Sequence, residues 1–310
     1  MNNHKFNQDE ELFLAFEEAK QVHNYLLAEQ LAQKIYQKYP SLDNHYRIVE
    51  LYFVQDFVQK AYEIALEEKE SYERSAKYLT KYAQLAILND EFLYARRLLL
   101  QTIVPNKELL HVKKQLASAE ELYTSIYVYK LREKKKQWQD AFAHIRPIFD
   151  SEFRVLTSQL PLLTFQTFIK DLLPSAKNPF LIAKTCEVIF QLELSMDLYL
   201  IDVFTEKEVR IASDELTAPN QQPFVKKCEQ LLAQSLANKD VYLYEMLQNQ
   251  LLQQLMLTYP FTPPIAAENY IRLTIQLYQT GQISEKEELV TIKQYQLIQE
   301  KYQQIIQKLL

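Results

Sequence analysis

The sequence contains a single glycine, Gly281, among its 310 residues. Glycine makes up about 7% of an ordinary globular protein, because it adopts positive φ angles and lets the backbone approach a ligand closely. A chain with so little glycine cannot form a Walker-type phosphate loop, a dinucleotide-binding turn or the usual nucleophile elbow. Tight β-hairpins are also disfavoured, since their turns prefer Asn-Gly or Asp-Gly. We therefore expect helices with short connections.

The helix boundaries carry capping signals in place of glycine. Two N-cap and proline pairs predict the starts of helices, at Asn178-Pro179 and Thr262-Pro263. A capping-box pattern at Ser284 predicts a long final helix over 284–310. Gly281 precedes it, where the helix before needs a left-handed residue. Since nearly every segment also has the apolar spacing of an amphipathic helix, the sequence predicts an all-α fold.

A short pattern recurs in the first half of the chain: an aromatic residue followed three places later by alanine. The pairs are Tyr25 with Ala28, Phe92 with Ala95, and Trp138 with Ala141, and Phe57 with Ala61 forms an imperfect copy. The four alanines are 33, 34 and 46 residues apart. A period near 34 residues is typical of a repeated helix–turn–helix pair.

In these features the sequence resembles the tetratricopeptide repeat (TPR) family over about residues 8–150. Ala19 and Ala86 each stand nine residues before a repeat alanine, where the family has a small residue in its first helix. Arg132 departs from that pattern in the last unit, and the spacing of 46 implies an insertion or a lengthened helix around 105–120. The resemblance implies an array of antiparallel helix hairpins, a TPR-like α-solenoid.

We expect the array to occupy residues 1–150 and a less regular helical region to occupy 151–310. The polar segment near 205–223 is expected to be a loop or a short helix. The final helix has an apolar stripe, which favours packing within a monomer, with a homodimer through this helix as the alternative. The stripe consists of Tyr295, Ile298, Tyr302, Ile305 and Leu309, and Leu297, Ile306 and Leu310 widen it.

In a helical array the first helices of successive units line the concave face. Counting from the repeat alanines, we expect this face to carry a mixture of charged, amide and aromatic side chains. They are Glu17, Lys20, Gln21, Lys77, Gln84, Tyr123, Lys130 and Lys134. Such a surface can bind an extended peptide through amide hydrogen bonds and lysine contacts to acidic groups, and an ordinary hydrated surface is the alternative.

The sequence offers no pattern for catalysis or metal binding. No two of the five histidines are three or four residues apart, so no helical metal motif is present. Cys186 and Cys228 are 42 residues apart and are expected to be buried, reduced thiols. We therefore expect no enzymatic activity, cofactor or metal. No signal peptide and no apolar run of about 20 residues is present, so we expect a cytoplasmic protein.

The segment "KKKQWQDAF", residues 134–142, allows two interpretations. Lys134, Lys135, Lys136 and Trp138 have the composition of a nucleic-acid contact, with cations for phosphates and an indole for stacking. A net charge of −5 argues against it. The favoured interpretation is structural, with Trp138 packed between two helices and the lysines at an exposed helix end.

The leading functional expectation is a non-catalytic scaffold or adaptor that binds a protein or peptide on the concave face. The alternative is a peptide-responsive regulatory receptor that acts on a protein target, similar to the peptide-pheromone receptors of Gram-positive bacteria. Those receptors that bind DNA carry a helix-turn-helix domain first. Because the repeats already begin near residue 8, we expect no such domain here.

Overall fold

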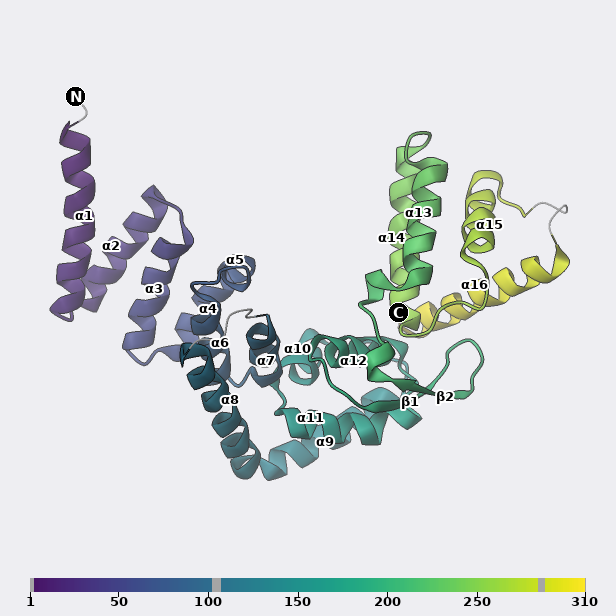
Figure 1. Ribbon diagram of the computed structural model, residues 1–310, viewed down its shortest axis with the longest axis horizontal. Helices are drawn as coiled ribbons and strands as arrows, with labels where there is room; N and C mark the ends of the chain where they lie inside the picture. Colours follow the sequence, from purple (N-terminus) through teal and green to yellow (C-terminus); the bar gives the residue numbers. More distant parts are fainter. Residues whose placement is uncertain (1–2, 102–106, 284–287, 310) are drawn as a thin grey trace. The chain divides into compact units, whose positions relative to one another are not determined.

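The computed structural model describes residues 3–101, 107–283 and 288–309 (Figure 1). These residues form sixteen α-helices, α1 to α16, and a single two-stranded sheet. The expected all-α class is therefore confirmed, with one small β-hairpin added. The chain divides into two compact units. The first contains the described residues up to Ile126 together with Ser158–Leu162, and the second contains Tyr127–Thr157 and the described residues from Leu163 onward.

The helices of the first unit are short, and neighbours in the sequence pack on one another. They are α1 (Asn3–Gln21), α2 (Tyr25–Lys38), α3 (Leu42–Val54), α4 (Val58–Glu67), α5 (Lys69–Glu73), α6 (Leu79–Leu88), α7 (Phe92–Leu100) and α8 (Lys107–Ile126). Helix α1 contacts α2, α3 contacts α4, and α6 contacts both α7 and α8. The repeat alanines Ala28, Ala61 and Ala95 lie in α2, α4 and α7 and are completely buried. Their small side chains allow the paired helices to approach closely.

The same turn ends α1, α3 and α6. Its central residue has a positive φ: His23 (58°), Asp56 (62°) or Asp90 (60°). In each turn the following amide donates to the carbonyl five residues back, as Asn24 N does to Ala19 O at 2.9 Å. This is the Schellman motif, which usually has glycine at the left-handed position. The three turns recur at intervals of 33 and 34 residues, in step with the repeat alanines.

One histidine is enclosed within the first unit. His45, on α3, is buried, and its Nδ1 lies 3.0 Å from the hydroxyl of Tyr72. Its Nε2 has no hydrogen bond among the described residues, although the exposed carboxylate of Glu67 is 3.9 Å away. Burial lowers the pKa of His45, because the charged imidazolium would lose its hydration, and this outweighs the attraction of Glu68 and Glu67.

This histidine makes the stability of the protein depend on pH. Below about pH 6.5 the unfolded chain protonates this imidazole while the folded chain does not, so stability falls with decreasing pH until the folded pKa is reached. The slope contributed by one group is at most about 1.4 kcal/mol per pH unit. We expect His45→Gln to flatten the dependence of urea unfolding on pH below neutrality. His111→Gln, at an exposed position, serves as the comparison, and an equal effect of the two changes would contradict this explanation.

The second unit contains longer helices and the β-hairpin. Its α-helices are α9 (Val128–Ala143), α10 (Asp150–Arg154), α11 (Leu162–Leu172), α12 (Pro179–Gln191), α13 (Pro223–Leu236), α14 (Val241–Thr258), α15 (Ala267–Thr280) and α16 (Leu289–Leu309), and α11 begins at the last residue of the first unit. A π-helical segment follows α10 (Val155–Gln159), and 3₁₀ turns lie at Leu173–Ser175, Ser213–Glu215 and Pro219–Gln221. In the described part of the chain, no helix is both long and apolar enough to cross a lipid bilayer.

Two of the capping predictions for this unit are confirmed and one is wrong. Asn178 caps α12, since its Oδ1 accepts a hydrogen bond from Leu181 N. Gly281 ends α15 in the left-handed conformation with φ of 73°. Thr262-Pro263 does not start a helix, because α15 begins only at Ala267. The capping box predicted at Ser284 lies outside the described residues.

The polar segment near 205–223 is partly a strand, which corrects the expected loop or short helix. Strand β1 (Asp197–Ile201) pairs antiparallel with β2 (Glu208–Ala212), with Tyr199 opposite Arg210. The connection forms without glycine. Asp202 Oδ1 accepts a hydrogen bond from Phe204 N at 2.8 Å, and Glu206 adopts the left-handed conformation with φ of 57°. The Asp202 carboxylate and the left-handed Glu206 therefore form a turn of the kind that Asn-Gly usually forms.

A second correction concerns the basic segment. The predicted helix end at Lys134–Lys136 does not exist, because α9 continues from Val128 to Ala143. No proline or glycine interrupts these residues, so nothing breaks the helix. Trp138 is only 4% exposed and packs edge-on against Phe142, with ring centroids 6.2 Å apart. Trp138 is buried, as the structural interpretation required, although this ring contact lies within α9 and not between two helices. Its indole is therefore not available for stacking on a base.

The final helix packs within the second unit. Tyr295, Ile298, Tyr302 and Ile305 are all buried, as the apolar stripe predicted. The first three belong to a core with α13, α14 and α15, in which Leu232, Leu251 and Leu273 are also buried. The wider part of the predicted stripe is exposed at Leu297.

A fourth Schellman motif ends α12, and it carries a residue poorly suited to it. Glu193 has φ of 51°, and the next amide, Leu194 N, donates to Ile189 O at 3.2 Å. Left-handed backbone costs an L-residue other than Asn or Asp about 1–2 kcal/mol, and the greater flexibility of unfolded glycine offsets part of the gain. We expect Glu193→Gly to raise the free energy of unfolding by about 1 kcal/mol. Glu193→Ala should give no such gain in thermal unfolding, and equal stabilisation by both changes would contradict a backbone cause.

Candidate functional site

Cross-helix ion pairs connect α1, α3 and the start of α6. The Glu17 carboxylate accepts a hydrogen bond from Arg47 Nη1 at 2.6 Å, and Lys20 Nζ lies 2.5 Å from Glu50 Oε2. In a third pair, Lys77 Nζ, just before α6, lies 2.9 Å from Asp43 Oδ2 at the start of α3. We call the surface formed by α1, α3, α6 and α8 the first-helix face. Its named members are Glu17, Lys20, Asp43, Arg47, Glu50, Lys77, Gln84, His111, Lys114, Gln115 and Ser118.

Aromatic rings lie beneath the charges of the first-helix face. The rings of Tyr46 and Tyr78 are 4.6 Å apart, which joins α3 to the residue preceding α6. Lys81 Nζ is 5.2 Å from the centroid of Tyr46, and Lys77 Nζ is 4.7 Å from that of Tyr78. Such cation–π contacts restrain the lysine ammonium groups over the ring faces. The cations here are therefore engaged within the protein.

The same network sets the charge state of Asp43. Hydrogen bonds from Lys77 and from the Tyr78 hydroxyl, both 2.9 Å, lower the pKa of the Asp43 carboxyl below its ordinary value. This part of the face consequently remains charged and internally paired at neutral pH. Because the pairs are exposed, each contributes little to stability.

The first-helix face opens into a groove where α6 meets α8. The groove has a volume of about 510 Å³ and is lined by Gln84, Ile87, Leu88, His111, Lys114, Gln115, Ser118 and Ala119. Leu88 is 51% exposed, which places a large apolar side chain at its edge. Among the described residues neither His111 nor Lys114 has an ion-pair partner, and Gln115 Oε1 is a buried acceptor without a donor.

The structure brings together only part of the predicted binding set. Glu17, Lys20 and Lys77 lie on the first-helix face, and Gln84 lines its groove. Gln21 is exposed at the last residue of α1.

The remaining predicted residues lie elsewhere. Tyr123 is 7% exposed, and its ring packs edge-on against Phe92 at 5.2 Å, so it belongs to the core of the first unit. Lys130 and Lys134 lie on α9 in the second unit, where Lys130 Nζ is 5.1 Å from the Tyr127 ring.

The groove residues on α8 were missed by the sequence prediction. The spacing of the alanines predicted an insertion or a lengthened helix around 105–120, and the 20-residue helix α8 starts there at Lys107. The signal that identifies them is the apolar stripe of Leu109, Val112 and Leu116, which is buried and turns the polar side of α8 outward.

The described residues contain no reactive thiol and no metal-binding cluster. Cys186 and Cys228 are free and buried, as predicted, and burial raises the pKa of each thiol to about 12. A thiol with so high a pKa is almost entirely protonated at neutral pH and is a poor nucleophile. Within the described ranges, no three His, Cys, Asp or Glu side chains are arranged to hold a metal ion.

Two of the lysines in the basic segment are paired within the second unit. Lys135 Nζ forms an ion pair with Asp171, and Lys136 Nζ lies 3.2 Å from Glu133 Oε1. These pairs reduce the positive charge that the segment presents to solvent.

Comparison of the chain with protein-family models, with curated proteins and with solved structures found no match.

Proposed function

We propose that this chain is a non-catalytic scaffold that binds a protein or peptide on the first-helix face, with the groove between α6 and α8 as the principal contact. The supporting observation is a contrast along this face. Toward α1 and α3 its charges are neutralised by internal ion pairs, whereas the groove combines an exposed leucine with uncommitted polar groups. Uncommitted polar groups around an apolar surface are characteristic of binding sites.

The chemistry of the groove favours an extended segment with one apolar and one acidic side chain. The apolar side chain would pack on Leu88 and Ala119, and the acidic group would meet Lys114. The amide of Gln84 is placed to hydrogen-bond a peptide backbone. We further propose that α1 to α7 form a TPR-like array, which the recurrence of the Schellman turn and of the buried alanines supports.

Site-specific photo-crosslinking tests this proposal. A photoreactive benzoylphenylalanine is introduced at Gln84 in the groove and, in a separate protein, at the exposed residue Glu67 on α4. We expect a defined protein to be crosslinked in native extract from position 84 and not from position 67. Equal crosslinking from both positions would refute the groove as the binding site.

A pair of neighbouring substitutions on α8 provides the matched control. Ser118→Arg places a long side chain in the groove, whereas Ala117→Arg adds the same side chain at an exposed residue outside it. Crosslinking from position 84 should be lost with Ser118→Arg and retained with Ala117→Arg. Loss with both variants would indicate a general charge effect and contradict the assignment.

A further inference from the structure

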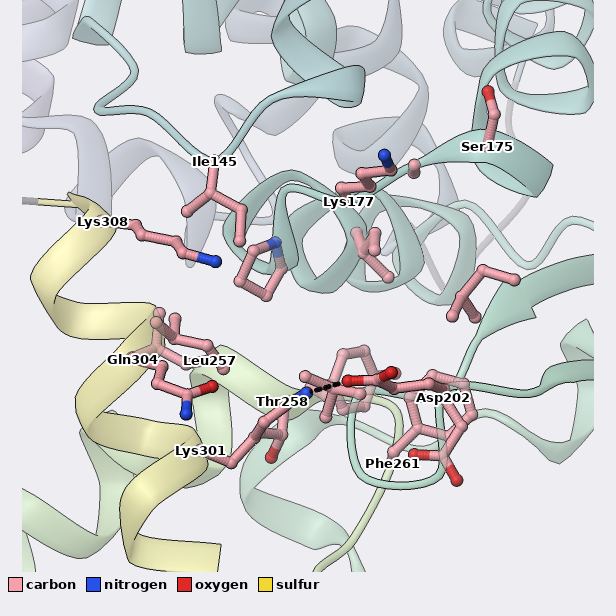
Figure 2. A pocket seen from close by; sticks show the side chains of 18 of the residues that line it. Ile145, Ser175, Lys177, Asp202, Leu257, Thr258, Phe261, Lys301, Gln304 and Lys308 are labelled. Atoms are coloured by element: carbon pink, nitrogen blue, oxygen red, sulfur yellow. Dashed lines mark hydrogen bonds and ion pairs between the residues drawn. The ribbon is translucent and has the colours of Figure 1, made fainter.

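The second unit contains a cavity of about 580 Å³ (Figure 2). Five segments that are distant in the sequence enclose it: the residue Ile145 after α9, the chain entering α12, the turn after β1, the end of α14, and α16. A volume between about 300 and 1,000 Å³ is typical of sites for small molecules. The cavity therefore has room for a ligand larger than a few water molecules.

Most of the cavity wall is apolar. Ile182, Ile201, Val203, Phe261 and Ile305 line it, from α12, the hairpin, the segment after α14, and α16. These side chains offer no hydrogen bonds, so they favour a ligand with a hydrocarbon body.

The acidic groups of the lining are already engaged. Glu206 Oε1 lies 2.5 Å from Lys301 Nζ, and this hydrogen bond lowers the pKa of Glu206. Both oxygens of Asp202 are used within the turn, since Oδ1 accepts from Phe204 N and Oδ2 from Thr205 Oγ1, each at 2.8 Å. Neither carboxylate is free to bind a cationic ligand.

The cavity lining also contains cationic side chains. Figure 2 shows the side chain of Lys308 extending from α16 toward Ile145 across the opening. In the described part of the chain, neither Lys308 nor Lys177, at another part of the lining, forms an ion pair, although the charge of Lys308 also contributes to lowering the pKa of Glu206. Three lysines and two carboxylates give the lining a formal charge of +1, whereas the whole chain carries −5. The cavity is thus apolar inside and locally basic.

We propose that this cavity binds an apolar monocarboxylate, with its hydrocarbon part against Ile182 and Phe261 and its carboxylate on Lys308. A single negative charge matches the lining, because Asp202 and Glu206 would repel a second one. The carboxylate can belong to a free medium-chain acid or to the C-terminus of a short apolar peptide. This site lies wholly in the second unit and is independent of the groove between α6 and α8.

Isothermal titration calorimetry with the full chain and decanoate tests the charge requirement. We expect decanoate to bind and decanol, which has the same chain without the charge, to bind about tenfold more weakly or not at all. Lys308→Gln should weaken decanoate binding by about tenfold and remove the preference over decanol. Lys293→Gln, on an exposed residue of α16 outside the cavity, should change nothing. Absence of decanoate binding, or equal binding of decanoate and decanol, would overturn the proposal.

Val203→Trp tests the location, since the larger side chain fills the cavity from the hairpin. We expect this variant to keep its circular dichroism spectrum and lose decanoate binding. Retained binding would place the ligand elsewhere and refute the assignment. The two sources are separated with N-acetyl-Leu-Leu-Phe as the free acid and as the amide. Tighter binding of the acid than of decanoate, with loss on amidation, assigns a peptide C-terminus, and the reverse order assigns a free acid.

Discussion

Phe92→Ala is expected to lower the free energy of unfolding by about 3–5 kcal/mol, as for other buried phenylalanines. Phe92 begins α7, is 1% exposed, and packs edge-on against Tyr123 of α8. Truncation removes its buried area and leaves a space that helices α6, α7 and α8 cannot easily close. Urea unfolding of the full chain, followed by far-UV circular dichroism, measures the loss in the transition of the first unit.

Phe57, the residue that precedes α4, provides a control. It belongs to the imperfect copy of the sequence pattern and is 58% exposed. Because its ring is largely in water, we expect Phe57→Ala to change stability by no more than about 0.5 kcal/mol. Similar losses for Phe57→Ala and Phe92→Ala would mean that the ring of Phe92 does not hold these helices together.

Arg96→Met is expected to destabilise the protein by about 3 kcal/mol, because it leaves a buried carboxylate without its cation. Arg96 on α7 forms a bidentate pair with Glu120 on α8, with Nε donating to Oε1 at 3.0 Å and Nη2 donating to Oε2. Glu120 is nearly buried and also accepts from Leu162 N at 3.0 Å. One carboxylate thus joins two helices and the segment Ser158–Leu162 within the first unit.

The double variant Arg96→Met/Glu120→Leu separates the loss of the pair from the burial of an unpaired charge. Removing both charged groups should cost less than Arg96→Met alone, since no isolated carboxylate remains. Chemical unfolding of both single variants and the double variant gives the coupling free energy. A double variant as unstable as the sum of the two single variants would show that the two side chains do not interact.

The sequence predicted the helical class and the burial of the repeat alanines because both depend on local patterns. The alanines of α2, α4 and α7 are buried, and so is Ala141 of α9. The unit predicted at Trp138 was wrong in its helix boundaries, since α9 continues from Val128 to Ala143. The turn before Trp138 was predicted only from the alanine spacing of 46 residues, which is far from the usual period. The sequence there contains no proline or glycine that would end a helix.

The β-hairpin was missed because the prediction relied on glycine as the marker of a turn. The alternation in β1 was present, with Leu198 and Leu200 buried while Asp197 and Tyr199 are exposed. It extends over only five residues. Such a short run is difficult to separate from a helix segment by periodicity. The left-handed Glu206 lies in a turn held by hydrogen bonds to Asp202, so local side-chain bonding can support a turn without glycine.

Only part of the candidate site could be predicted, because local spacing places residues on a helix face and does not show their tertiary contacts. Lys20, Lys77 and Gln84 follow from counting along the first helices, and all three lie on the first-helix face. Tyr123 could not be separated from surface residues by spacing alone, because its burial depends on Phe92 of another helix. The cavity of the second unit combines five distant segments, and no short pattern in the sequence identifies such an assembly.

The distribution of aromatic residues gives the second unit an intrinsic optical signal of its own. The only tryptophan in the sequence, Trp138, is buried in the second unit. The first unit holds a cluster of buried tyrosines, among them Tyr72, Tyr82 and Tyr94, and no tryptophan. Excitation at the red edge, where only indole absorbs, therefore reports the second unit alone. Tyrosine emission reports both units, because the second unit also contains buried tyrosines, among them Tyr259, Tyr270 and Tyr302. Unfolding of the second unit can thus be followed by itself in an unlabelled sample, through its tryptophan.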